Sequence, residues 1–141
     1  MDEAQILDIV RNAKTIAVYG MQDDSNSELP AQRIPAALQA RGYVIYPVNP
    51  KLHSALGRPA FARMADLPIA PDILEVFRQS KYIPALADEI LALPAQLRPR
   101  TVWLQSGISD AQAEAKLTAA GIQVVSDSCL GVYAARSGKA P

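Results

Sequence analysis

The stretch KTIAVYG, residues 14–20, decides the fold that this chain is expected to adopt. It is a short, β-branched-rich apolar run that ends in a glycine, which is typical of a strand buried on both faces of a sheet. Four later runs repeat the pattern, and they are YVIYPV at 43–48, DILEVF at 72–77, TVWLQ at 101–105 and IQVVS at 122–126. We therefore predict five buried strands.

Segments with helix signals alternate with these runs. Asp2 can cap a helix before the first strand, and Ser109 with Gln112 forms a capping box for a helix that runs to Ala120. The remaining helices are expected at 30–41, 82–93 and 129–136. The stretch 49–71 carries four prolines and predicts an irregular excursion between the second and third strands.

Strands and helices that alternate at this spacing predict an α/β fold, with a parallel sheet covered by helices on both faces. Right-handed crossovers favour a doubly wound sheet of five strands in the order 3-2-1-4-5. The chain has no repeat, no low-complexity segment and no interdomain linker. Its 141 residues therefore predict a single domain over 1–141.

The composition argues against several classes of partner. Lys plus Arg number 14 and Asp plus Glu also number 14, so no basic excess points to nucleic acid or to an anionic membrane surface. No apolar stretch approaches the about 20 residues that span a bilayer, and the acidic start MDEAQILDIV is unlike a signal peptide. A single cysteine fits a reducing compartment. We expect a cytoplasmic protein that binds neither nucleic acid nor membranes.

The ligand site of such a sheet lies beyond the carboxyl ends of the strands, where the strand order reverses. With the expected order, this point lies between the first and fourth strands. Four loops then face the crevice, at 20–29, 49–52, 77–81 and 105–109. We therefore look for binding residues in these loops.

Lys51 stands on this rim, in the stretch YPVNPK at 46–51. An NAD-binding domain is expected to place a carboxylate there for a ribose hydroxyl, and the first loop offers only Gly20 instead of G-x-G-x-x-G. Both features count against NAD. A lysine at this point suits an anion, such as a phosphate on a nucleotide ribose, and the alternative is an ordinary solvated loop lysine.

Other residues near the rim are weaker candidates. Arg33 could reach a phosphate near the start of its helix, and Phe77 with Arg78 could flank an adenine ring. Gln105 and Gly107 lie on the loop at the expected switch point, where a glycine allows close backbone approach. A solvated charge for Arg33 and a core position for Phe77 remain the alternatives.

No catalytic or metal constellation is visible. The single histidine, His53, has no partner for a zinc site, and the adjacent Asp23 and Asp24 fit turn chemistry better than catalysis. Cys129 is interpreted as a small buried hydrophobe, with a reactive thiol at a helix N-terminus as the alternative. Trp103 is expected in the core, with its indole N–H near a partner. The sequence therefore favours a binding domain over an enzyme.

Six stretches, in the right order over about 13–136, resemble the stand-alone CoA-binding domain proteins. They are TIAVYG, QARGYVIYPVNPK, LGRPAFARMADLP, DILEVFRQSKYIPALADEIL, TVWLQSGI and GIQVVSDSCLGVYAAR. These relatives are small Rossmann-like bacterial and archaeal proteins. Their domain is similar to the CoA-binding region of the succinyl-CoA synthetase alpha subunit and of NDP-forming acyl-CoA synthetases.

The resemblance implies coenzyme A as the ligand and the ribose 3′-phosphate as the anion that meets Lys51. The CoA would be faced by Gly20 and Met21, and its nucleotide end would be held by Asn49, Pro50 and Lys51. The adenine or pantetheine path would be bordered by Phe77, Arg78 and Gln79. The far side would be closed by Gln105 and Gly107. The chain departs from the family in a longer loop at 21–30, whose aspartate pair would repel phosphates if it pointed inward, and at Ser128, where the family tends to have an arginine.

We therefore expect non-catalytic binding of CoA or an acyl-CoA. The alternatives are an NAD(P)-dependent oxidoreductase, the CoA-binding component of an acyl-CoA synthetase with a partner subunit, and a sensor in which the Cys129 thiol pairs with the CoA thiol. The synthetases of this type act through a phosphohistidine on a further domain, so a complete synthetase activity is not expected here. A homodimer through the apolar helices remains open.

Overall fold

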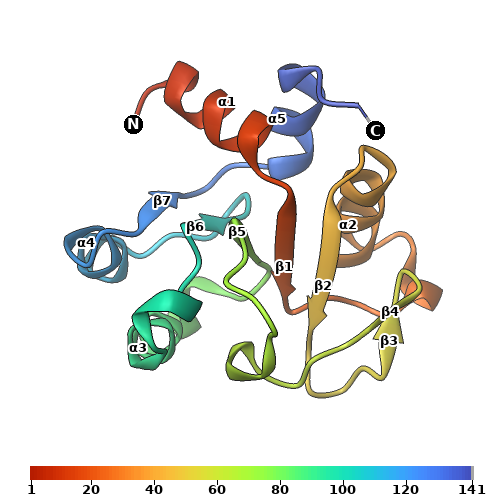
Figure 1. Ribbon diagram of the computed structural model, residues 1–141, viewed down its shortest axis with the longest axis horizontal. Coiled ribbons are helices and arrows are strands. Elements are labelled where there is room, and N and C mark those ends of the chain that lie inside the picture. Colours follow the sequence, from red (N-terminus) through yellow and green to blue (C-terminus); the bar gives the residue numbers. More distant parts are fainter. Residues whose placement is uncertain (141) are drawn as a thin grey trace.

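The computed structural model describes residues 1–140 and contains one five-stranded parallel sheet (Figure 1). Its strands are β1 (Thr15–Tyr19), β2 (Val44–Val48), β5 (Ile73–Val76), β6 (Thr101–Leu104) and β7 (Gln123–Val125). The helices are α1 (Glu3–Asn12), α2 (Pro30–Ala40), α3 (Ile83–Ala92), α4 (Ala111–Ala119) and α5 (Leu130–Ser137). The predicted α/β fold is confirmed, with every expected strand and helix present.

The predicted strand order was wrong. The observed order is β2-β1-β5-β6-β7, which is 2-1-3-4-5 when the sheet strands alone are numbered. The excursion explains the difference: it forms a small hairpin of β3 (Ser54–Ala55) and β4 (Arg58–Pro59), and Phe61 then bonds to the outer edge of β2. The Phe61 N–H donates to the Pro47 carbonyl at 2.9 Å. With that edge occupied, the third strand pairs with the free side of β1.

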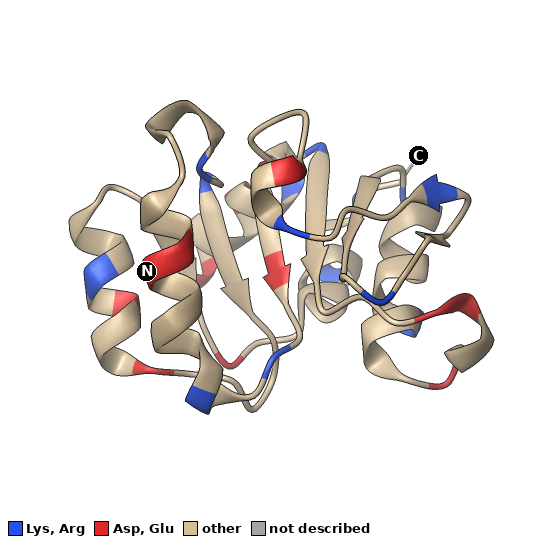
Figure 2. Cartoon of the chain, turned by 90° about the horizontal axis from the view of Figure 1, so that it is seen from below, with Lys and Arg blue, Asp and Glu red and all other residues tan. Residues whose placement is uncertain are grey.

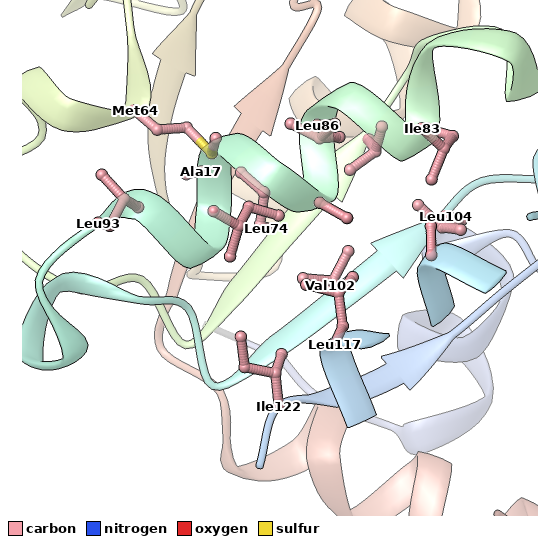
Figure 3. Close-up of a cluster of buried hydrophobic side chains, with 14 of the residues drawn as sticks. Ala17, Met64, Leu74, Ile83, Leu86, Leu93, Val102, Leu104, Leu117 and Ile122 are labelled. Carbon is pink, nitrogen blue, oxygen red and sulfur yellow. The ribbon is translucent and has the colours of Figure 1, made fainter. Parts of the chain in front are cut away.

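Helices cover both faces of the sheet, as Figure 1 shows. Side chains alternate between faces along each strand, so each strand contributes to two cores. One core lies beneath α3 and α4 and includes Ala17, Leu74 and Val102 (Figure 3). The other lies beneath α1, α2 and α5 and includes Val18 and Trp103. Burial on both faces accounts for the nearly continuous apolar runs of the sequence.

The N-cap predicted for α1 is confirmed, whereas the N-cap of α4 lies one residue after the predicted position. Asp2 caps α1 in a full capping box with Gln5. For α4 the cap is Asp110, whose Oδ1 accepts the Ala113 N–H at 2.9 Å. The expected cap, Ser109, instead donates its backbone N–H to the Ser80 hydroxyl at 3.1 Å. The capping box predicted at Ser109 was therefore wrong.

One acidic side chain lies inside the sheet. Glu75 of β5 is completely buried and stands in register between Val18 and Trp103. Among the residues that the structure describes, neither of its carboxylate oxygens has a hydrogen-bond partner. Burial alone raises the pKa of Glu75 from 4.5 to about 8, because a charged form would be desolvated without compensation. A carboxylate within a run expected to be buried on both faces is itself a sequence signal, and the sequence analysis did not single it out.

The charged residues are otherwise distributed over the chain. Figure 2 shows basic and acidic positions interspersed on loops and helices. Over residues 1–140, no helix combines the length and apolar character needed to cross a membrane.

Candidate ligand-binding crevice

The observed topology places the switch point between β1 and β5, rather than between the first and fourth strands. Because all five strands are parallel, their carboxyl ends still meet at one edge of the sheet, and the loops predicted to face the crevice lie there. At the switch point, the Phe77 N–H donates to the Tyr19 carbonyl at 2.9 Å, and the Gly20 N–H donates to the Val48 carbonyl at 3.0 Å. The ends of β2, β1 and β5 are therefore tied together.

Two adjoining cavities lie along this edge. The first, called here the basic cavity, has a volume of about 460 Å³. Its lining includes Gly20, Asn49, Pro50, Lys51, Arg63 and Arg78. The second, called here the Cys129 cavity, has a volume of about 690 Å³. Its lining includes Arg33, Gln79, Gln105, Gly107, Ile34 and Cys129.

Phe77, Arg78 and Gln22 line both cavities, so the two spaces adjoin across the ends of β1 and β5 and are together called the crevice. The structure thus brings together all of the predicted binding residues except Met21.

Met21 does not reach the crevice. Its side chain is completely buried in the core beneath α1, α2 and α5, because the chain turns inward after Gly20. Its carbonyl oxygen accepts a hydrogen bond from the Asn49 Nδ2 at 2.9 Å. The Asn49 Oδ1 in turn accepts the Lys51 N–H at 2.9 Å. The Asn49 side chain therefore joins the loops after β1 and β2 and fixes the backbone that carries Lys51.

The aspartate pair of the first loop does not line either cavity. The Asp23 Oδ1 accepts the Ser25 N–H at 2.7 Å, and this backbone hydrogen bond lowers the pKa of Asp23. Both carboxylate oxygens of Asp24 accept the Leu56 N–H, at 3.2 and 3.1 Å, at the tip of the β3–β4 hairpin. The predicted turn chemistry is confirmed for Asp23, whereas Asp24 holds the distant β3–β4 hairpin against the first loop.

The far wall is held by side-chain hydrogen bonds to the backbone. The Gln105 Oε1 accepts the Leu130 N–H at 2.9 Å in the first turn of α5, and the Asp127 Oδ1 accepts the Gly107 N–H at 2.6 Å. The buried Trp103 donates its indole N–H to the Ser128 carbonyl at 2.8 Å, which confirms the core role predicted for it. Gln105 and Gly107 therefore shape the cavity wall, and the Gly107 N–H is already engaged.

Cys129 is half-buried: it packs against the core beneath α1, α2 and α5, as expected for a small hydrophobe, but it also lines the cavity and is not fully buried. It occupies the N-cap position of α5. Leu29, Ile34 and Ile108 line the same cavity and give this end of the crevice an apolar character. The sequence placed Ile34 on a helix but could not show that the start of α2 borders the crevice.

The basic cavity combines three cationic side chains with one carboxylate. Lys51, Arg63 and Arg78 line it together with Glu89 of α3. The Arg78 guanidinium lies 4.2 Å from the centroid of the Tyr82 ring, which holds it in a cation–π contact. Burial raises the pKa of Tyr19, and the nearby Glu89 carboxylate adds to this effect. The excess of positive charge suits a polyanionic group.

Comparison with known proteins agrees with this geometry. Residues 14–135 match the family described as "CoA binding domain". The chain is 33% identical over 130 residues to the uncharacterized protein YneT of Bacillus subtilis, covering 92% of each chain.

Solved structures share the fold. A Thermus thermophilus protein, cell-free ID.343, superposes with a TM-score of 0.88 at 40% identity, over 97% of this chain and 99% of that one. The dinucleotide forming acetyl-coenzyme A synthetase 1 of Ca. Korarchaeum cryptofilum superposes with a TM-score of 0.68 at 17% identity. That match covers 86% of this chain and 27% of the synthetase chain, and it is a likeness of fold alone.

Proposed function

The chain belongs to the CoA-binding domain family, and we propose that it binds coenzyme A or an acyl-CoA in this crevice without catalysing a reaction itself. The observation that carries the proposal is the division of the crevice into a basic cavity and a more apolar cavity that meet at Phe77 and Arg78. CoA has the same division, because a 3′-phosphorylated ADP group is joined to an uncharged pantetheine arm.

The apolar side chains of the Cys129 cavity favour one orientation of the ligand. The nucleotide end, with its 3′-phosphate, would lie in the basic cavity beside Lys51. The pantetheine arm would cross Phe77 and enter the Cys129 cavity, where its thiol or acyl group meets Ile34 and Cys129. Opposite placement would bring the 3′-phosphate toward Ile34 and Ile108.

The pyrophosphate has a natural partner at the start of α2. Leu29 occupies the N-cap position and has no polar group to cap the helix, and Pro30 follows at the first helical position. An anion at this end would complement the helix dipole rather than the amides, because Pro30 has no N–H and the N–H groups of Gln32 and Arg33 donate to the Leu29 carbonyl. Arg33, exposed in the first turn and lining the same cavity, adds a positive charge.

The half-buried thiol supports a second candidate, a thiol-linked CoA sensor. In this candidate the Cys129 thiolate attacks one sulfur of CoA disulfide, the disulfide form of the ligand. The Cys129–CoA disulfide forms as the CoA–CoA disulfide breaks, and one CoA thiolate leaves. With CoA disulfide as the oxidant, replacement of Cys129 by Ala should abolish retention of CoA. Unchanged retention in this variant would rule out the thiol-linked sensor.

Calorimetric titration of the purified protein tests the proposal. We expect micromolar affinity for CoA and no binding of NAD. Comparison of the affinities for CoA and acetyl-CoA shows whether the protein prefers the free thiol or an acyl thioester. NADP is the informative comparison, because it also carries a ribose phosphate but lacks the pantetheine arm. Binding of NADP without binding of CoA would contradict the proposal and favour the oxidoreductase alternative.

A further inference from the structure

The basic cavity contains a cation that the rim of the sheet does not supply. Arg63 follows the segment in which Phe61 pairs with Val48 of β2, and it precedes the short 3₁₀ helix η2 (Met64–Asp66). It lines the cavity together with Lys51. The irregular excursion therefore contributes to the site as well as covering the edge of β2.

The backbone around Arg63 is fixed on both sides. Before it, the Asn49 N–H donates to the Phe61 carbonyl at 2.9 Å. After it, Met64 and Leu67 are buried in the core beneath α3 and α4. Since Asn49 also positions Lys51, the segments that carry the two cations are anchored to each other at the end of β2.

Within residues 1–140, the Arg63 side chain is held only by an exposed carboxylate. Its Nη2 lies 3.2 Å from the Asp66 Oδ1, with 69% of the arginine side chain and 40% of the aspartate side chain exposed. Such a pair is screened by water and contributes little to stability. The other arginine of the excursion, Arg58, is already engaged, because it donates to the Ile45 carbonyl and stacks on the Tyr46 ring. Arg63 is therefore the arginine of this excursion that can turn to a ligand at low cost.

We propose that Arg63 determines specificity for the ribose 3′-phosphate of CoA, binding it together with Lys51, and that Asp66 holds Arg63 while the site is empty. The inference rests on the proposed function. A guanidinium presents two parallel N–H donors to a phosphate, whereas the Lys51 ammonium acts as a point charge. The exposed Asp66 carboxylate competes with the phosphate for Arg63.

Titration with CoA and with dephospho-CoA, which lacks only the 3′-phosphate, tests the inference. For Arg63→Ala we expect the affinity for CoA to fall about tenfold and that for dephospho-CoA to stay unchanged. Asp66→Asn is expected to act in the opposite direction and raise the affinity for CoA about threefold. In the double variant, the Asp66 effect disappears, because its target is absent.

Lys81→Ala is the matched control. Lys81 is an exposed cation near the crevice that contacts the Tyr82 ring at 5.1 Å and lies outside both cavities, so its loss is expected to leave both affinities unchanged. Circular dichroism melting verifies that each variant is folded.

The outcomes separate the two proposals. Wild-type protein that binds neither CoA nor dephospho-CoA would overturn the proposed function and this inference with it. Wild-type protein that prefers CoA, combined with an Arg63→Ala variant that weakens both ligands equally or neither, would overturn the role of Arg63 alone. Equal losses in Arg63→Ala and Asp66→Asn would show that the pair supports local structure, and would also overturn it.

Discussion

Gly20 packs against the backbone of Phe77 so closely that a Cβ added at position 20 would lie 2.7 Å from the Phe77 carbonyl oxygen. Gly20 also has a positive φ of 87°, which side chains other than hydrogen rarely allow. The contact joins the first loop to the end of β5 at the switch point of the sheet. The single glycine of the first loop therefore allows two walls of the crevice, the first loop and the end of β5, to pack closely together.

Gly20→Ala should destabilise the protein and weaken ligand binding, because either the loop or the end of β5 must move. We expect a loss of about 2–4 kcal/mol in the free energy of unfolding, measured in urea. Gly121→Ala is the control: Gly121 has nearly the same φ, 86°, but its added Cβ meets nothing within 4 Å. That variant should lose only the cost of the positive φ, about 1 kcal/mol. Equal losses in the two variants would show that the Phe77 contact is unimportant.

The buried Glu75 makes stability depend on pH. Its pKa is about 8 in the folded protein and near 4.5 when the chain unfolds. Between these values the folded state keeps a proton that the unfolded state releases, so this contribution to stability is complete below pH 4.5 and is lost as pH rises to about 8. The slope approaches about 1.4 kcal/mol per pH unit within this window.

Urea unfolding at intervals from pH 5 to pH 9 measures this effect. The free energy of unfolding of the wild-type protein should fall steadily as pH rises to about 8. For Glu75→Gln, whose side chain stays neutral, it should change much less with pH. Glu75→Asp retains an ionisable group and serves as the control for the substitution itself. Wild-type and Glu75→Gln curves with the same slope would contradict the assignment.

The fold class could be predicted because burial on both faces leaves a strong local pattern, seen in KTIAVYG and in TVWLQ. The strand order could not, since it depends on where the excursion 49–71 packs, and no local pattern shows that Phe61 occupies the edge of β2. Glu75 was not singled out, although its place in a run expected to be buried on both faces already implied a buried carboxylate. Its neighbours Leu74 and Val76 mark a buried strand, but only the register shows that the carboxylate lies between two apolar strands.

Most of the residues predicted to line the crevice do line it, although the predicted strand order was wrong, and the reason is geometrical. Parallel strands end at one edge in any order, so Lys51 and Gln105 reach the same crevice in the predicted and observed sheets. The position predicted for the Met21 side chain was wrong, because neighbouring residues of a loop can point in opposite directions, and Met21 points into the core instead of the crevice. Arg63 was missed because its position depends on the packing of the excursion rather than on a strand end.

The accessibility of Cys129 leads to a labelling prediction. It is the only cysteine, so alkylation by iodoacetamide reports on one position. If the pantetheine arm occupies the Cys129 cavity, saturating CoA should slow alkylation about tenfold or more, because access to the thiol is blocked; iodoacetamide is kept in large excess over CoA so that the CoA thiol does not deplete it. Dephospho-CoA at saturation should protect equally, since its pantetheine arm is the same. Labelling at the same rate with and without CoA would place the arm elsewhere.

Lys51 and Arg33 are expected to respond differently to the loss of the 3′-phosphate. Lys51 lines the basic cavity and Arg33 the Cys129 cavity beside the start of α2, so they should meet different phosphates. Lys51→Ala should weaken CoA about tenfold and barely change dephospho-CoA. Arg33→Ala should weaken both ligands by a similar factor, because both carry the pyrophosphate.

Titration of each variant with both ligands at two salt concentrations distinguishes these roles. Higher salt should weaken wild-type binding of CoA more than that of dephospho-CoA, because the 3′-phosphate adds charge to the interaction. Lys51→Ala should remove this difference, and Arg33→Ala should preserve it. If Lys51→Ala weakened both ligands equally, Lys51 would contact the pyrophosphate or the adenine ribose instead, and the orientation proposed for CoA in the crevice would have to be reversed or shifted along it.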